Sequence, residues 1–436
     1  MSEKNNNQGA IFKKLMDAIS NNNIDNVKKY LEEYKKYSLD VNEAIKYETY
    51  PIGPLPFACE NGNVEIIELI IDYGASLVKD GYTSYPLKNA VIGNHIDAVQ
   101  LLIDRGVPLN ANTDLGSKSK YAVVTAAEYK RFDILRLLID NGAKVNSEDN
   151  YYKTPLMMAS MHGNFEIVKY LVAMGADVNA RDYDGGNALA YAATNGYLDI
   201  VKFLIKNGID VKMRDDSDPS PLMGAARYGH LDIVKYLIDN KAEIKVKDEN
   251  GSTPLMGAPI ETARYLLELG VGINEKNKEG SNVLGNYIKK IHSYDTNPLH
   301  EEEPKKQMNL EQIKFYVENG AYIDFNDITK PVCVSAPDDV FLYFIEKGME
   351  ISNIDIQAEV CAKASIDRIK YFEENGMDLN NKELKEIIIY RSDIDRIEYF
   401  IERGVYTLRK ARWIARWGGF GDRARILKER AMNKNK

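Results

Sequence analysis

The chain has 436 residues, of which 44% are hydrophobic and 28% charged, and its formal net charge is −8 at pH 7. This is the balance of an ordinary folded protein, so disorder is not expected except at the ends. The first residues are polar and no apolar run approaches the roughly 20 residues of a bilayer span, so we expect neither a signal peptide nor a membrane helix.

Three cysteines, Cys59, Cys333 and Cys361, lie far apart in the sequence. An odd number of distant cysteines fits a reducing compartment better than a disulfide framework. We therefore expect packing roles for them and a cytoplasmic location. Delivery into another cell as an effector stays open as an alternative.

The N-terminal segment has the pattern of a helical hairpin. Residues Ile11 to Asn42 contain two amphipathic stretches and close with Leu39-Asp40-Val41-Asn42, but lack the Thr-Pro helix start that occurs further along. We expect residues 1–50 to form a capping repeat at the end of a larger array.

Helix-ending glycines recur at a fixed period in the middle of the chain. Gly142, Gly175 and Gly208 are 33 residues apart, and Lys241 occupies the next place. A period of this size is typical of stacked repeats, each of which buries its apolar face against its neighbours.

The clearest repeat runs from Tyr151 to Asn179. Thr154 can cap a first helix and Pro155 suits the first helical position, where its missing N–H costs nothing. Gly163 then turns the chain into a second helix with an apolar stripe. Gly175 ends that helix, and we expect the backbone of Gly175 to adopt the left-handed conformation.

The Thr154-Pro155-Leu156 start and the Gly175-Ala176-Asp177-Val178-Asn179 ending resemble the ankyrin-repeat family. The resemblance continues through copies ending at Gly208, Lys241 and Gly270, and weaker copies end at Gly74, Gly106 and Gly142. It implies an all-α ankyrin-repeat solenoid, with short β-turn or loop fingers, over residues 51–291.

The period shortens near the C-terminus, where Gly320, Gly348, Gly376 and Gly404 are 28 residues apart. The ten-residue stretches that end at Gly376 and Gly404 agree at 7 positions. Because the second helix is kept and no Thr-Pro-Leu remains, we expect the loss to fall in the first helix and in the loop before it. Residues 309–404 are thus predicted to be shortened repeats.

A polar, proline-punctuated insertion separates the two kinds of repeat. Residues 292–308 delay the second helix and are predicted to form a loop, which is either functional or else disordered or plain surface. We expect a disordered or plain surface loop rather than a functional one.

The end of the chain is basic. Residues 405–436 carry 10 Lys or Arg against 2 acidic residues, a charge of +8, so the preceding 404 residues carry −16. We expect a helical cap whose polar face is basic, with Trp413, Trp417 and Phe420 packed on the last repeat.

No constellation typical of catalysis, cofactor binding or metal binding is found. His95, His162 and His230 occupy the turn between two predicted helices, and the spacing of His292 and His300 matches no metal site. No Walker-type glycine loop is present. We therefore expect a protein that is not an enzyme, has no cofactor and binds no metal.

The resemblance also implies a binding face, because in an ankyrin array the loops before the first helices and the exposed ends of those helices line up as one concave surface. Tyrosine and arginine, which often carry interface energy, recur at these positions. The predicted partner-binding residues are Glu128, Tyr129, Tyr151, Lys153, Met161, His162, Arg181, Tyr183, Asp184, Asn195, Arg214, Asp216, Arg227 and Tyr228.

Two functions from different classes follow. The first is a non-catalytic scaffold, expected to be a monomer, that binds a protein partner on the concave face; sequence does not separate it from a regulatory or inhibitory array docked on an enzyme. The second is a binder of nucleic acid or an anionic surface through the basic cap. The charge of −16 on the remainder would repel a polyanion, so we expect no nucleic-acid partner.

Overall fold

The computed structural model describes residues 2–43, 45–47, 50–78, 86–110, 121–212, 220–296, 308–381, 384 and 394–405. The chain forms two compact units, Met1–Glu249 and Asn250–Lys436, called here the N-terminal unit and the C-terminal unit. Within each of them, the described residues are predominantly helical.

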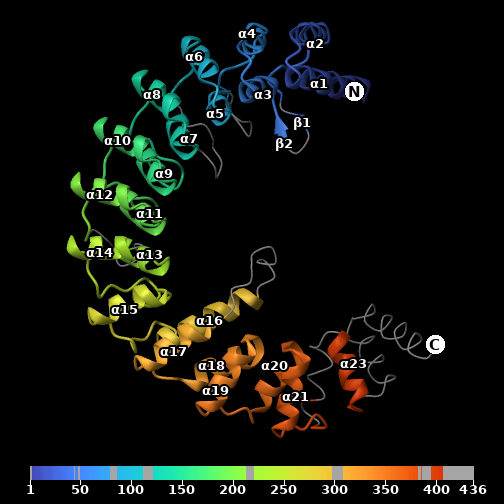
Figure 1. Ribbon diagram of the computed structural model, residues 1–436. Coiled ribbons are helices and arrows are strands. Elements are labelled where there is room, and N and C mark those ends of the chain that lie inside the picture. The colour runs from blue at the N-terminus through green and yellow to red at the C-terminus, as the bar shows by residue number, and fades with distance from the viewer. Residues whose placement is uncertain are drawn as a thin grey trace. The chain divides into compact units, whose positions relative to one another are not determined.

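The N-terminal unit is a stack of helical hairpins in two layers, with the first helices of the hairpins on the inner side (Figure 1). One short antiparallel hairpin, in which Ile45 lies opposite Ile52, joins the first two helical hairpins. The elements are α1 (Ser2–Ser20), α2 (Ile24–Lys36), β1 (Ile45–Tyr47), β2 (Tyr50–Ile52), α3 (Pro54–Asn61), α4 (Val64–Asp72), α5 (Pro86–Ile92), α6 (Ile96–Asp104), α7 (Ala122–Glu128), α8 (Phe132–Asp140), α9 (Pro155–Met161), α10 (Phe165–Ala173), α11 (Ala188–Thr194), α12 (Leu198–Lys206), α13 (Pro221–Arg227) and α14 (Leu231–Asp239).

The first helices start as the sequence predicts. Thr154 Oγ1 accepts a hydrogen bond from the Met157 amide at 3.3 Å, and Pro155 occupies the first position of α9. In the next repeat the Asn187 side chain caps α11 in the same way, accepting from the Ala190 amide at 2.9 Å. The cap matters because the first amides of a helix have no partner within it.

The second helices end in the left-handed conformation that the glycine period predicts. The φ angles are 93° at Gly142, 85° at Gly175 and 87° at Gly208, and Lys241 adopts 71° in the fourth place. Glycine takes this conformation at little cost, whereas a side chain is strained there. The expected position of each helix end is therefore confirmed, including the one that lysine occupies.

Each second helix buries one apolar stripe against the first helices. In α10 the side chains of Ile167, Val168 and Leu171 are fully buried. Burying one such side chain contributes about 1.5–3 kcal/mol. A hairpin has no complete core of its own, so this burial depends on the neighbouring repeats.

Polar ties also join consecutive repeats. The Asn146 side chain accepts from the Asp177 amide at 2.9 Å, and Asn179 accepts from the Asp210 amide at 3.0 Å. His230 Nε2 bonds the Thr194 carbonyl of the preceding repeat at 3.1 Å. Such bonds fix the register of one repeat on the next.

The C-terminal unit contains the shortened repeats. Its second helices α17, α19, α21 and α23 begin 28 residues apart, which confirms the second-helix period. The elements are α15 (Ile260–Glu268), α16 (Val283–Thr296), α17 (Leu310–Glu318), α18 (Phe325–Ser335), α19 (Asp338–Glu346), α20 (Ile354–Lys363), α21 (Ile366–Glu374) and α23 (Ile394–Glu402).

One expectation about the shortened repeats is wrong: their first helices have not lost residues. Helices α18 and α20 have 11 and 10 residues, whereas α9 and α11 have 7. The loss lies in the loops, because α18 begins at Phe325, soon after Gly320, whereas α11 begins only at Ala188 after Gly175.

The insertion begins differently from the loop that the sequence predicts. Helix α16 continues to Thr296, so the first residues of the segment 292–308 are helical. Residues 297–307 lie outside the described part of the chain.

Two arginines tie the shortened repeats together. Arg368 in α21 is 5% exposed and donates to the carbonyls at the end of α18, at 3.1 Å to Val332 and 2.8 Å to Ala336. Twenty-eight residues later, Arg396 donates to the Lys363 and Ala364 carbonyls at the end of α20, both at 2.7 Å. In both cases the arginine caps the C-terminal end of the first helix of the preceding repeat, where cations are favourable.

A buried carboxylate adds an electrostatic tie in the same unit. Glu359 is 8% exposed, with the Lys330 and Lys363 ammonium nitrogens 3.1 and 3.0 Å from its oxygens. Burial alone would raise the pKa of this carboxyl, but hydrogen bonds from Lys363 and Lys330 outweigh it and hold the pKa below its ordinary value. The ionised form therefore stabilises the folded state.

We expect Glu359→Gln to lower the free energy of unfolding by about 1–2 kcal/mol at pH 7. Because the folded pKa is depressed, the stabilisation is complete above the ordinary carboxyl pKa of about 4.3 and is lost as pH falls through the folded value. Urea unfolding of both proteins from pH 7 to pH 3 should therefore show the difference shrinking at acid pH. The exposed Glu374→Gln is the control, and a constant difference at all pH values would contradict this origin.

The three cysteines are buried and free, as their expected packing role requires. Burial raises the pKa of Cys333 and of Cys361 to about 12. Their thiols therefore stay protonated and poorly reactive at neutral pH.

Candidate functional site

The predicted binding face lies on the N-terminal unit, where α7, α9, α11 and α13 pack side by side. The residue that follows each of these helices is its C-cap, and the four C-caps are Tyr129, His162, Asn195 and Tyr228. One side chain per repeat therefore forms a row along the ends of the first helices.

The finger loops, which join a second helix to the next first helix, are built on a buried aspartate. Asp149 Oδ1 accepts from the amides of Tyr151 and Lys153, both at 2.9 Å. Asp182 Oδ1 accepts from the amides of Asp184 and Gly186, at 3.1 and 2.7 Å. Both aspartates are 6% exposed. Each loop is thus a tight turn held from inside by its own carboxylate.

Adjacent finger loops are joined through the backbone. The Tyr183 amide donates to the Tyr151 carbonyl at 2.8 Å, and the Tyr183 and Tyr151 backbones are therefore side by side. In the C-terminal unit the Lys278 amide donates to the Asn250 carbonyl, also at 2.8 Å.

The four predicted tyrosines are well exposed: 43% for Tyr129, 53% for Tyr151, 72% for Tyr183 and 60% for Tyr228. This exposure distinguishes them from tyrosines that cover the core. Of the other predicted residues, Asp184, Asn195 and Arg227 are exposed, Glu128, Lys153, Met161, His162 and Arg181 are half-buried, and Arg214 and Asp216 lie outside the described residues.

Some charged members of the face already have partners within the fold. The Lys153 ammonium lies over the Tyr191 ring, 5.1 Å from its centroid, and the Tyr191 hydroxyl donates to Asp182. Burial and this hydrogen bond raise the pKa of Tyr191. Arg227 is 3.8 Å from Asp248. The tyrosines are accordingly the more available groups.

Sequence reasoning missed one exposed residue of this face, Tyr152. It is 53% exposed and has a φ of 58°. A 33-residue alignment places it with Gly185, which also has a positive φ. An aromatic residue in a glycine position was the feature that could have revealed it.

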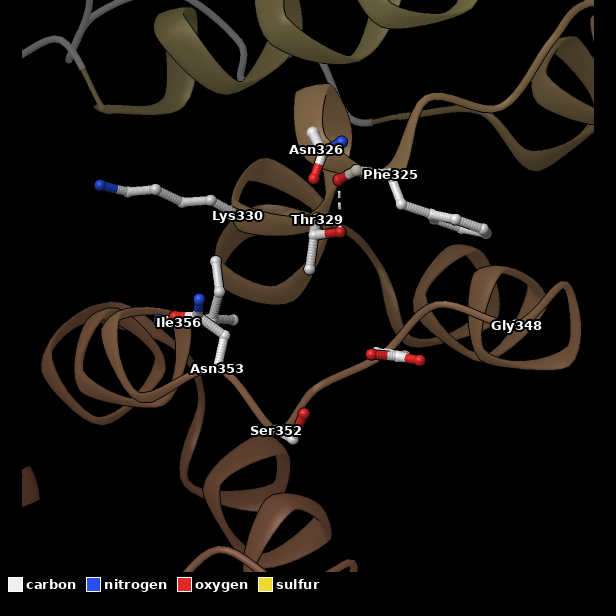
Figure 2. A pocket seen from close by; sticks show the side chains of 9 residues that line it. Phe325, Asn326, Thr329, Lys330, Gly348, Ser352, Asn353 and Ile356 are labelled. Atoms are coloured by element: carbon white, nitrogen blue, oxygen red, sulfur yellow. Dashed lines mark hydrogen bonds between the residues drawn. The ribbon is translucent and has the colours of Figure 1, made fainter.

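The C-terminal unit contains a second candidate site. It is a cavity of about 400 Å³ between α18, α20 and the connection after Gly348. Figure 2 shows Thr329 and Lys330 on α18 and Asn353 and Ile356 near the start of α20. The lining residues are Phe325, Asn326, Thr329, Lys330, Gly348, Glu350, Ser352, Asn353 and Ile356.

Several polar groups around this cavity serve the fold itself. Asn353 caps α20 by accepting from the Asp355 amide at 2.8 Å, and Thr329 donates to the Phe325 carbonyl at 2.5 Å. Lys330 pairs with Glu359. The cavity occupies the side from which the finger loops are missing, and we assign it no ligand.

Three of the described histidines have structural partners. His95 Nε2 is hydrogen-bonded to the Glu60 carbonyl at 2.9 Å, and His230 Nε2 is hydrogen-bonded to the Thr194 carbonyl. His292 Nδ1 lies 2.6 Å from Ser335 Oγ. Over the described ranges, no three His, Cys, Asp or Glu side chains gather as a metal site would require. His300 lies outside those ranges.

In the part of the chain that the structure covers, no helix has both the length and the apolar character needed to cross a membrane. The basic segment 405–436, with Trp413, Trp417 and Phe420, falls outside the described residues beyond Val405. Its predicted role as a cap or as an anion-binding surface stays a prediction.

Stacked helical hairpins with tight finger loops, tied from repeat to repeat, define a helical solenoid of the protein-interaction class. The chain belongs to the ankyrin-repeat family, because the family model for ankyrin repeats matches residues 15–113, 123–215 and 189–277, more than half of the chain. Ankyrin repeats are generally protein–protein interaction modules, and the family is typically non-catalytic.

Among solved structures, 583 chains match. One is the crystal structure of the human ASB11 ankyrin repeat domain, with 23% sequence identity and a TM-score of 0.44. The match covers 50% of this chain and 99% of that one. The search of curated proteins returned no match.

Proposed function

We propose that this protein is a non-catalytic scaffold that binds a folded protein partner on the finger loops and first-helix ends of the N-terminal unit. The observation that carries the proposal is the exposure of Tyr129, Tyr151, Tyr183 and Tyr228 on consecutive repeats. Tyrosine offers a large rigid contact area with a polar end, and it is enriched among residues that dominate binding energy.

The rigid support behind these side chains favours the same function. The buried Asp149 and Asp182 hold the finger loops, so little conformational entropy should be lost when a partner binds. Fixed loops on a rigid scaffold are where binding residues are commonly placed.

Replacing Tyr151, Tyr183 and Tyr228 together by alanine is expected to reduce partner capture about a hundredfold, since each anchor contributes more than about 1 kcal/mol. Helical circular dichroism should not change, because all three side chains are exposed. Quantitative affinity capture from the source cell, followed by mass spectrometry, measures the loss.

The matched control is Tyr322→Ala, which removes a tyrosine that is 65% exposed on the C-terminal unit. It should leave capture intact. Unchanged capture by the triple variant, with its fold preserved, would reject the proposed face.

A further inference from the structure

The same turn recurs in three described finger loops. The carbonyl of the first turn residue accepts the amide of the fourth, at 2.9 Å for Asp149, 3.0 Å for Asp182 and 3.0 Å for Asn277. The fourth residue is left-handed in each turn. Its φ is 58° at Tyr152, 76° at Gly185 and 80° at Gly280.

Tyr152 therefore holds a glycine position, and the fold does not explain why. A bulky residue with a positive φ is strained, whereas glycine takes that conformation freely. The turn uses the Tyr152 amide, which any residue but proline supplies, and the side chain remains 53% exposed. Residues kept under backbone strain occur preferentially at functional sites.

Two more exposed tyrosines lie beside it. Tyr151 precedes Tyr152 in the turn, and the backbone bond from Tyr183 to Tyr151 brings the next finger alongside. Within the described residues, no hydrogen bond, ion pair or ring contact engages the side chain of Tyr151, Tyr152 or Tyr183. Three aromatic side chains are thus available on two adjoining loops.

Two exposed carboxylates lie on these loops next to the tyrosines, although the same loops also carry the exposed Lys144 and the half-buried Arg181. Glu148 and Asp184 are exposed, and neither pairs with a cation within the described residues. The Lys153 ammonium is over the Tyr191 ring instead. Aromatic faces beside carboxylates attract a guanidinium, which stacks on the rings and hydrogen-bonds the carboxylate.

The long-range charge favours the same kind of partner. The whole chain carries −8 at pH 7, which favours a basic partner surface over an acidic one.

We propose that Tyr151, Tyr152, Tyr183 and Asp184, the fingertip cluster, receive an arginine side chain from a basic loop of a folded partner protein. The inference rests on the proposed function and names the chemistry of its partner. Tyr152 keeps its strained conformation because its ring forms one wall of this arginine site.

The test uses the full chain and a capped peptide, acetyl-Gly-Leu-Arg-Leu-Gly-amide, with a second peptide in which neutral citrulline replaces arginine. In ligand-observed NMR titrations the arginine peptide should bind about tenfold more tightly than the citrulline peptide. Its binding should weaken with added salt, because the carboxylates are exposed.

Tyr152→Gly should weaken binding of the arginine peptide about tenfold and raise the midpoint of thermal unfolding by about 2 °C, because it removes the ring and the strain together. Tyr152→Phe keeps the ring and should bind as the wild type does. A gain in stability accompanied by a loss of binding is a combination that a merely structural tyrosine would not give.

Equal affinity for the two peptides, or undiminished binding by Tyr152→Gly, would overturn the arginine site. If the triple alanine variant also loses partner capture, the proposed face stands and only the arginine chemistry fails. If the triple variant captures the partner normally, the proposed function itself fails, whatever the peptides do.

Discussion

Replacing Arg368 by methionine is expected to lower the free energy of unfolding of the C-terminal unit by about 3 kcal/mol. Breaking a buried charged network typically costs this much, because the remaining polar groups lose their partners. Arg368 donates to the carbonyls of Val332, Cys333 and Ala336, and it contacts Asp338. Methionine preserves the aliphatic stem but leaves these acceptors at the end of α18 unpaired.

Urea unfolding monitored by circular dichroism measures this loss, and hydrogen exchange at the α18 amides localises it. Lys370→Met on the same helix is the control, because the Lys370 side chain is 52% exposed and its pair with Asp367 is a surface one. It should change stability by less than about 0.5 kcal/mol. Equal effects of the two substitutions would show that Arg368 does not tie α21 to α18.

Arg368→Lys gives a further check. Lysine keeps the positive charge but lacks the planar fork that reaches several carbonyls at once. An intermediate loss is expected. Full retention of stability would mean that the charge alone matters.

A methyl group added at Gly163 is expected to cost about 3 kcal/mol. Gly163 has a φ of 70°, and a Cβ there would lie 2.8 Å from Cδ1 of the Tyr197 ring and closer still to Cε1 and Cζ. Backbone strain of about 1–2 kcal/mol and overpacking of about 1–3 kcal/mol both oppose the substitution. The result would be a weakened contact between two central repeats.

Gly175 separates these two effects. Its φ is 85°, but nothing lies within 4 Å of an added Cβ. Gly175→Ala should therefore show only the strain, about 1 kcal/mol. Urea unfolding of both variants gives the difference.

A double-mutant cycle with Tyr197→Ala tests the clash directly. Removing the ring should recover the overpacking part of the Gly163→Ala cost and leave the strain part. Strictly additive costs would place the cause of the loss elsewhere than in the Tyr197 ring.

The positions of the helix ends could be predicted because they depend on local chemistry. Thr154 caps α9 and Pro155 begins it for reasons that lie within a few residues. Gly175 ends a helix because only glycine takes the left-handed conformation freely. Such requirements recur once per repeat, so the period reports them even where lysine replaces glycine at position 241.

The lengths of the shortened first helices could not be predicted in the same way. The 28-residue period states how much is missing but not which segment is missing. Helices α18 and α20 are longer than α9, and the loops alone are shorter. That outcome depends on how neighbouring repeats pack rather than on a local sequence pattern.

The candidate site was predictable in outline. Tyr129, Tyr151, Tyr183 and Tyr228 could be placed on exposed positions because the repeat assigns every residue a place. Tyr152 was missed, because what distinguishes it is its positive φ angle and the glycine that occupies the same position in the next repeat.

The sequence by itself determined the class of fold, the register of the repeats and the change of period, because capping, glycine conformation and apolar spacing act over a few residues. Only the tertiary structure decided how one repeat is tied to the next. The reach of Arg368 to α18 and the backbone bond from Tyr183 to Tyr151 each join residues about one repeat apart. Such contacts depend on how the hairpins pack, and no local pattern encodes them.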